Sequence, residues 1–115
     1  VSPASLSARK DDWAKVVKVW YRVVDYLADP ATQEDAIKIM AARVNLPPAE
    51  YKGFVDGTRI LKLAEAQKAF KKGKGLDSIY GSSVVVDKFN TANKVYKDSQ
   101  KVDEYNDPSF TAALK

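Results

Sequence analysis

A broad apolar stripe over residues 11–27, followed at once by an Asp-Pro break, is the feature that most constrains the fold of this chain. The apolar side chains recur at intervals of three and four residues, at Trp13, Val16, Val17, Trp20, Val24 and Leu27. This spacing predicts an amphipathic helix from Asp11 to Leu27. Further apolar residues lie beside the stripe, at Val19, Tyr21, Val23 and Tyr26. Because more than half of the circumference is then apolar, we expect this helix to be buried on two sides.

A second helix is predicted after the break, from Thr32 to Asn45. Asp29 or Thr32 suits its N-cap, and Pro30 is favourable in a first turn. Asn45 suits the left-handed residue that ends a helix, and Pro47 prevents continuation. The predicted inward face consists of Ala36, Ile37, Met40, Ala41 and Val44.

The rest of the chain predicts mainly short helices. The first two are a helix over Pro48–Asp56 and a helix over Ala64–Lys72, which Gly73 and Gly75 end. The next runs from Ser78 to Asn90 or Asn93, and its predicted inward face consists of Ile79, Tyr80, Val85, Val86 and Phe89. One turn over Val102–Tyr105 and a last helix from Pro108 to Leu114 follow. Residues 58–63 fit either an extended piece or the start of the next helix. Residues 84–86 are three valines that also fit a strand, but helix is favoured because no turn signal follows. We expect extended backbone at 1–7, with Ser5 or Ser7 as a cap, and at 94–97.

These elements predict an all-α fold of about six helices with little or no strand, in a single helical region spanning residues 1–115. The apolar faces are broad for so small a bundle. Helices of this kind often cover a sheet, and no sheet is encoded in this sequence. We therefore expect the chain to be a fragment of a larger protein, or an oligomer that supplies the missing surface.

Composition excludes several kinds of chemistry. The 115 residues contain no cysteine and no histidine, so disulfides, thiol nucleophiles and Cys/His zinc sites are impossible. The usual general base at neutral pH is also absent. No apolar run approaches the roughly 18 residues of a membrane span. The net charge is +4, but the lysines are scattered instead of clustered with aromatic residues, which argues against nucleic acid as a partner. We predict no enzymatic activity, no cofactor and no metal.

Two cation-bearing segments are possible anion sites. The run Lys71-Lys72-Gly73-Lys74-Gly75 lacks the spacing of a Walker loop, and we interpret it as a solvated loop after a helix. Arg59, close to Asp56-Gly57, has the geometry to hold a sulfonate or carboxylate bidentately, whereas an ion pair or solvent exposure is the simpler interpretation.

Three further groups each have a functional and a structural interpretation. Trp13, Trp20, Tyr21 and Tyr26 suit an aromatic ligand cage, but their helical spacing favours core packing. Tyr80, Ser82 and Ser83 around Gly81 suit a small polar site at a helix start, and capping explains them as well. The adjacent carboxylates Asp11-Asp12 and Glu34-Asp35 diverge on a helix, so they complement the helix dipole. Glu34 and Lys38 are spaced for an ion pair.

The order of several segments resembles one family of transport proteins. The segments are Asp12-Trp13-Ala14-Lys15-Val16-Val17, Asp25-Tyr26-Leu27-Ala28-Asp29-Pro30, Ala36-Ile37-Lys38-Ile39-Met40-Ala41, Pro48-Ala49-Glu50-Tyr51, Gly57-Thr58, Leu63-Ala64-Glu65-Ala66-Gln67-Lys68-Ala69-Phe70, Leu76-Asp77-Ser78-Ile79-Tyr80, Phe89 and Asp107-Pro108-Ser109-Phe110. Together they are similar to the C-terminal part of periplasmic substrate-binding proteins of nitrate, sulfonate, taurine and bicarbonate ABC importers. The motifs are packing and capping patterns and include no catalytic signature.

The resemblance implies a parent protein with two α/β lobes of the type II periplasmic-binding-protein fold that close over a small anionic solute. It implies the membrane subunits of an ABC transporter as partners, and a periplasmic or other extracytoplasmic location, with or without a membrane anchor. This chain would be a helical fragment unlikely to bind solute alone, and no ligand-binding residue is carried over to it. The alternative is a stand-alone helical module for protein interaction or self-association.

Overall fold

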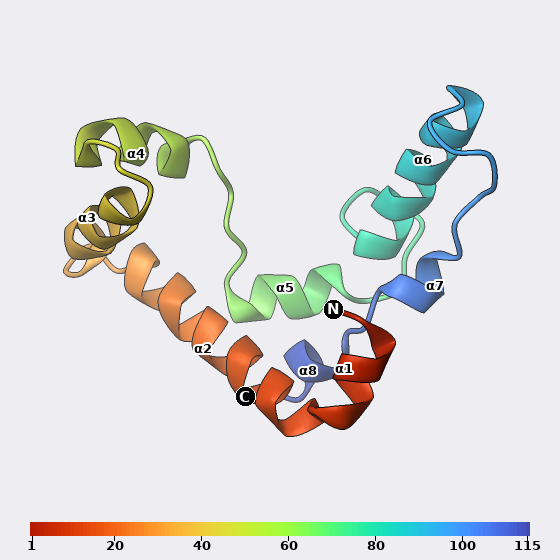
Figure 1. Cartoon of the computed structure of the whole chain (residues 1–115), viewed down its shortest axis with the longest axis horizontal. Coiled ribbons are helices and arrows are strands. Elements are labelled where there is room, and N and C mark those ends of the chain that lie inside the picture. The colour runs from red at the N-terminus through yellow and green to blue at the C-terminus, as the bar shows by residue number, and fades with distance from the viewer. The chain divides into compact units, whose positions relative to one another are not determined.

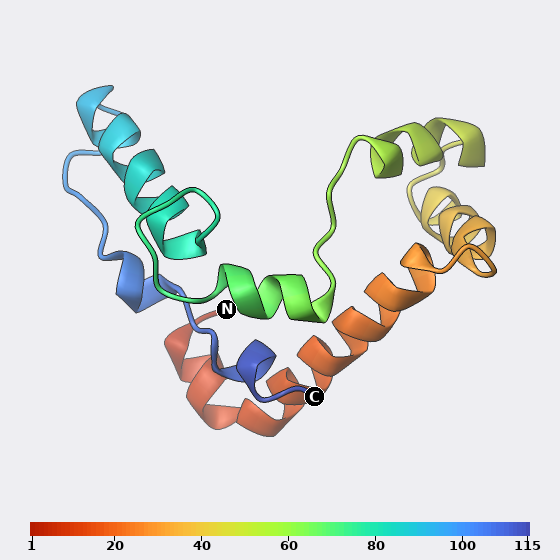
Figure 2. The same cartoon turned by 180° about the vertical axis from the view of Figure 1, so that it is seen from behind.

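The fold is entirely helical, as the sequence predicted. The computed structural model describes all of residues 1–115 and contains eight α-helices and no strand (Figure 1; Figure 2). The helices are α1 (Pro3–Ala8), α2 (Lys10–Ala28), α3 (Gln33–Arg43), α4 (Pro48–Asp56), α5 (Leu63–Ala69), α6 (Ile79–Ala92), α7 (Val102–Tyr105) and α8 (Ser109–Ala112). The chain divides into two compact units, Val1–Lys62 and Leu63–Lys115, within the single region that the sequence predicted. No helix in the structure has the length and apolar content that a membrane span requires.

Helix α1 corrects the expectation of an extended lead-in. The Ser2 hydroxyl oxygen accepts a hydrogen bond from the backbone N–H of Ser5 at 3.2 Å, and Pro3 occupies the first helical position. A serine cap followed by proline is a strong helix start. Ser5 therefore does not cap a helix. Its hydroxyl instead accepts a hydrogen bond from Nε1 of Trp13 at 3.2 Å, which joins α1 to α2.

The core of the first unit lies where α2 meets α3. Leu27 packs with Ala36 and Ile37, and all three are at least 94% buried. Four partly buried side chains surround them, those of Met40, Tyr51, Val55 and Ile60. Helices α2, α3 and α4 are thus tied together by one small apolar cluster. The predicted inward face of the second helix is confirmed at Ala36, Ile37, Met40 and Ala41, but it is wrong at Val44, which is 52% exposed.

Two helices end in the same way, with one residue in the left-handed region. Asn45 has φ of 56°, and the N–H groups of Asn45 and Leu46 donate to the carbonyls of Ala42 and Ala41. This is the Schellman pattern, and it confirms the predicted role of Asn45. Lys94 does the same after α6, with φ of 59°. Residues 94–97 are therefore a turn and a loop, where the sequence suggested an extended segment.

In the second unit, α6 runs through the three valines without a break, so the helix that the sequence favoured is confirmed. The predicted inward face of this helix is largely wrong. Tyr80, Gly81 and Asp87 are buried, whereas Val85, Val86 and Phe89 are exposed. At least half of each of these three side chains is exposed. Helices α5 and α8 are both shorter than predicted, and Gln67 joins them by donating to the carbonyls of Thr111 and Leu114.

Asp87 is a buried carboxylate that holds the loop after α6. Only 6% of Asp87 is exposed. One carboxylate oxygen accepts hydrogen bonds from the Tyr96 hydroxyl at 2.9 Å and the Gln100 backbone N–H at 2.7 Å, and the other accepts a short one from the Ser99 hydroxyl. The bonds from Gln100 and Ser99 lower the pKa of Asp87 below its ordinary value of 3.8. Burial has the opposite effect and is outweighed.

We expect Ile37→Ala to destabilise the first unit and Ile39→Ala to leave it nearly unchanged. The two isoleucines lie on α3, but Ile37 is 5% exposed and Ile39 is 62% exposed. Loss of buried methyl groups should lower the free energy of unfolding by about 2–4 kcal/mol, against about 0.5 kcal/mol or less at the exposed site. Urea unfolding followed by tryptophan emission measures this, because both tryptophans lie in the first unit. Equal effects at the two sites would contradict the position of this core.

For the second unit we expect Asp87→Asn to lower the thermal midpoint by several degrees and to reduce its acid dependence. Since the pKa of Asp87 is lower in the folded state, its stabilising effect is fully present above pH 3.8 and disappears as the pH falls through the folded pKa. The Gln100 amide resonance, followed by NMR against pH and temperature, reports the change. Asp98→Asn, at an exposed carboxylate of the same loop, is the control and should retain the acid dependence of the parent.

Candidate functional site

Helix α2 has a second apolar face that the chain leaves exposed. Tyr21, Val24 and Leu27 are buried on the inner side. The outer side carries five large apolar residues that remain about half exposed, namely Val16, Val19, Trp20, Val23 and Tyr26. Their spacing of three and four residues places them along one stripe. We call these five residues the outer face of α2.

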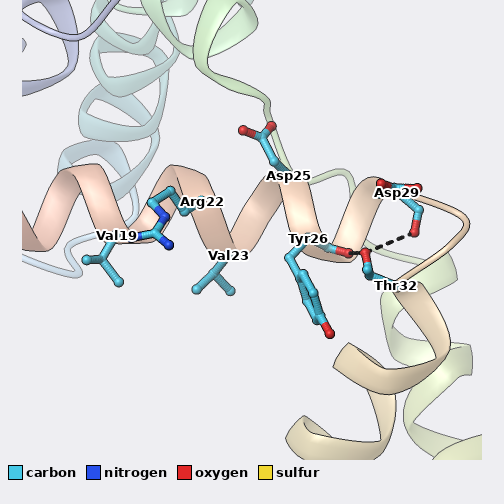
Figure 3. Close-up of a pocket in the computed structure, with 7 residues that line it drawn as sticks. All are labelled: Val19, Arg22, Val23, Asp25, Tyr26, Asp29 and Thr32. Carbon is cyan, nitrogen blue, oxygen red and sulfur yellow. Dashed lines mark hydrogen bonds between the residues drawn. The ribbon is translucent and has the colours of Figure 1, made fainter.

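A hollow of about 600 Å³ opens beside the C-terminal half of this face (Figure 3). Val19, Val23 and Tyr26 project from the same side of α2 (Figure 3). The remaining lining residues are polar, namely Arg22, Asp25, Asp29 and Thr32. The hollow therefore combines an apolar wall with charges of both signs, which suits contact with another protein surface.

The turn between α2 and α3 holds the end of this face in place. The Thr32 hydroxyl donates to the carbonyl of Tyr26 at 2.6 Å, and the Gln33 side chain donates to the carbonyl of Leu27 at 3.2 Å (Figure 3 shows Thr32). These two carbonyls have no partner within α2, so the side chains of the following turn satisfy them. Asp29 closes the turn by accepting from the N–H of Ala31 at 2.9 Å.

Tyr26 adds a side-chain link between the two helices. Its hydroxyl donates to a carboxylate oxygen of Asp35 at 2.8 Å. This hydrogen bond is the main cause of a raised pKa at Tyr26, because removing the phenolic proton would break it and bring two negative charges together. Thr32 and Asp29 are the two predicted N-cap residues of α3, but neither side chain caps this helix. Thr32 bonds to the end of α2, and Asp29 bonds within the turn.

The structure separates the four aromatic residues near the start of the chain. Tyr21 is buried and Trp13 is half-buried, as core packing predicts. Trp20 is 54% exposed and Tyr26 lies on the outer face, so core packing is wrong for these two residues. The sequence pattern predicted burial for all five residues of the outer face, so it did not indicate an exposed surface. The sequence feature that indicates a second apolar face on α2 is the total width of the apolar stripe over residues 11–27.

The other predicted positions have local roles. Asp12 pairs with Arg9 and Lys15, and Glu34 pairs with Lys38 at 2.7 Å, so the adjacent carboxylates diverge as expected. Arg59 is exposed, and the neighbouring Asp56 pairs with Lys52 at 2.6 Å.

The region around Gly81 is a close backbone contact. A Cβ atom at Gly81 would overlap with the carbonyl oxygen of Gly75, so only glycine fits there. The Ser82 hydroxyl donates to the Ile79 carbonyl of its own helix at 3.1 Å. The lysine run 71–75 forms an exposed loop after α5, as predicted.

Comparison of the chain with protein-family models, with curated proteins and with solved structures finds no match. The functional interpretation consequently depends on the sequence pattern and on the surfaces described above.

We expect Asp35→Asn to lower the pKa of Tyr26 toward 10.0, because the carboxylate that raises it is lost. The chemical shift of the Tyr26 ring carbon that carries the hydroxyl, followed against pH by NMR, measures this pKa. Asp25→Asn removes a carboxylate that lines the hollow but does not bond to the phenol, and it serves as the control. A Tyr26 pKa that is insensitive to Asp35→Asn would exclude the link between α2 and α3.

Proposed function

We propose that this chain forms the C-terminal helical part of a periplasmic solute-binding protein that serves an ABC importer for small anionic solutes such as nitrate, sulfonates or taurine. In this proposal the chain contributes packing surface and not ligand contacts. Its exposed helical faces cover other parts of the parent, and the solute site lies in those parts. The order of packing and capping segments, which resembles such proteins, supports this assignment.

The observation that carries the proposal is the exposed outer face of α2. Monomeric proteins rarely leave a contiguous apolar patch of more than a few hundred Å² in contact with water. Here five large apolar side chains, including Trp20 at 54% exposure, lie along one helix without cover from their own unit. A surface of this kind is typical of one that packs on another folded element.

A second group of exposed side chains extends the same reasoning to the second unit. Val86 and Phe89 are 56% and 64% exposed on α6, and their spacing of three residues places them on one face of that helix. Both units therefore present an apolar helix face, which is the pattern expected of helices that form an outer layer over a sheet.

Self-association is the alternative function that the outer face of α2 favours. Val16, Val19, Val23 and Tyr26 follow intervals of three and four residues, close to the a and d positions of a helix pair. In this case the partner surface is a second copy of the chain. Both functions use the same face, so they differ in the partner and not in the residues.

We expect the full-length product of the gene that encodes this chain to bind a small anion. Thermal-shift measurements against nitrate, taurine, an alkanesulfonate and bicarbonate should give a saturable rise in the midpoint for at least one of them. At a ligand concentration one hundred times Kd the stabilisation is about 2.7 kcal/mol. Chloride at the same ionic strength is the control. An open reading frame that begins directly before Val1, or no shift with any anion, would refute the proposal.

Light scattering on the chain itself separates the two functions. Self-association predicts a stable dimer that Trp20→Lys dissociates, because a charge placed in an apolar interface is costly. Phe54→Lys is the matched control, since Phe54 is similarly exposed at 57% but lies on α4, away from the outer face of α2. A dimer that is unaffected by Trp20→Lys would exclude this face as the self-association surface.

A further inference from the structure

A second hollow lies beside α6, wholly within the unit Leu63–Lys115. Its volume of about 630 Å³ lies within the range typical of small-molecule pockets. The buried Tyr80 and Gly81 belong to the lining, together with Val84, Val85 and Val102. Gly73, lysines 72, 74 and 88 and Asp103 complete it. The walls are thus mostly apolar, and cations outnumber the single carboxylate.

Three contacts keep the walls of this hollow in place. The Ser78 hydroxyl donates to the carbonyl of Lys71 at 2.8 Å and closes the loop that leads into α6. Gly81 allows the backbone of Lys74 and Gly75 to approach the helix closely. Lys72 pairs with Asp103 at 2.7 Å and so connects this loop to α7. The hollow is therefore formed before any ligand arrives, which lowers the entropic cost of binding.

Only one of the three lysines that line the hollow forms an ion pair. The ammonium group of Lys72 is engaged by Asp103 and also lies 5.4 Å from the centre of the Tyr80 ring. Lys74 and Lys88 line the same hollow and form no ion pair within the chain. Two free cations beside a wall of valines match a ligand that has both an anionic group and an apolar body.

We propose that the hollow beside α6, whose volume lies in the range of small-molecule pockets, binds an organic monoanion with an apolar body. The carboxylate or equivalent head group interacts with Lys74 and Lys88, and the hydrocarbon part contacts Val84 and Val85. This site differs from the exposed face of α6, because positions 81, 84 and 88 share one side of the helix and positions 86 and 89 another. The proposal does not depend on the transport function proposed above.

Octanoate is the probe, and amide chemical shifts of the whole chain are the measurement. We expect saturable shifts at Gly73, Lys74, Val84, Val85 and Lys88, with Kd on the order of 1 mM, as suits a ligand of ten heavy atoms. Two matched compounds separate the contributions. Octylammonium carries an apolar chain that is one methylene longer, with the opposite charge, and acetate carries the same charge without the chain. Both should bind at least tenfold more weakly than octanoate.

Variants locate the binding site. Lys74→Gln and Lys88→Gln should each weaken octanoate binding about threefold, as is typical of one exposed charge, and Val85→Asp should reduce it at least tenfold. Lys97→Gln, an exposed lysine of the same unit outside the hollow, should leave Kd unchanged. A dispersed amide spectrum verifies that each variant is folded. Equal binding of octylammonium, shifts centred on Val86 and Phe89, or unchanged Kd in both Lys74→Gln and Lys88→Gln would overturn the proposal.

Discussion

The first unit depends on one contact, the packing of Leu27 against Ala36 and Ile37 where α2 turns into α3. This cluster is small, and it uses only the inner side of α2. A helix with apolar residues over more than half of its circumference cannot bury them all against one neighbour. The exposed outer face of α2 is the direct consequence, and both functions proposed for the chain begin from it.

The polar contacts at this turn determine how α2 and α3 are joined. Thr32 and Gln33 donate to carbonyls at the end of α2, and Tyr26 donates to Asp35 on α3. Asp87 has a comparable role in the second unit, where it holds the loop after α6 through three hydrogen bonds. Such contacts link residues that lie 6 to 13 positions apart. Sequence patterns of helical period do not report them, because they join a helix to another helix or to the irregular segment beside it.

The sequence contains a stronger indication of the hollow beside α2 than of the hollow beside α6. The wide apolar stripe over residues 11–27 contained all the residues of the outer face of α2, but it predicted burial for them. The sequence features that indicate the hollow beside α6 are weaker. They are the lysine run 71–75 and Tyr80 with Gly81, for which a solvated loop and helix capping are sufficient explanations. Lys74 and Lys88 come together only because Gly81 admits the preceding loop against α6. That close approach is a property of the folded backbone.

The sequence by itself determined most of the helical segments, α1 excepted, and where several of them end. Periodic apolar residues, Pro48 and Asn45 act locally, so their effects are already present within a few residues of chain. The tertiary structure alone decided which apolar residues are covered. Ile37 and Ile39 are of one residue type and lie two positions apart, yet one is 5% exposed and the other 62%. Burial depends on which neighbours the chain can bring to a helix face, and in this chain those neighbours cover one side of α2 and leave the other open.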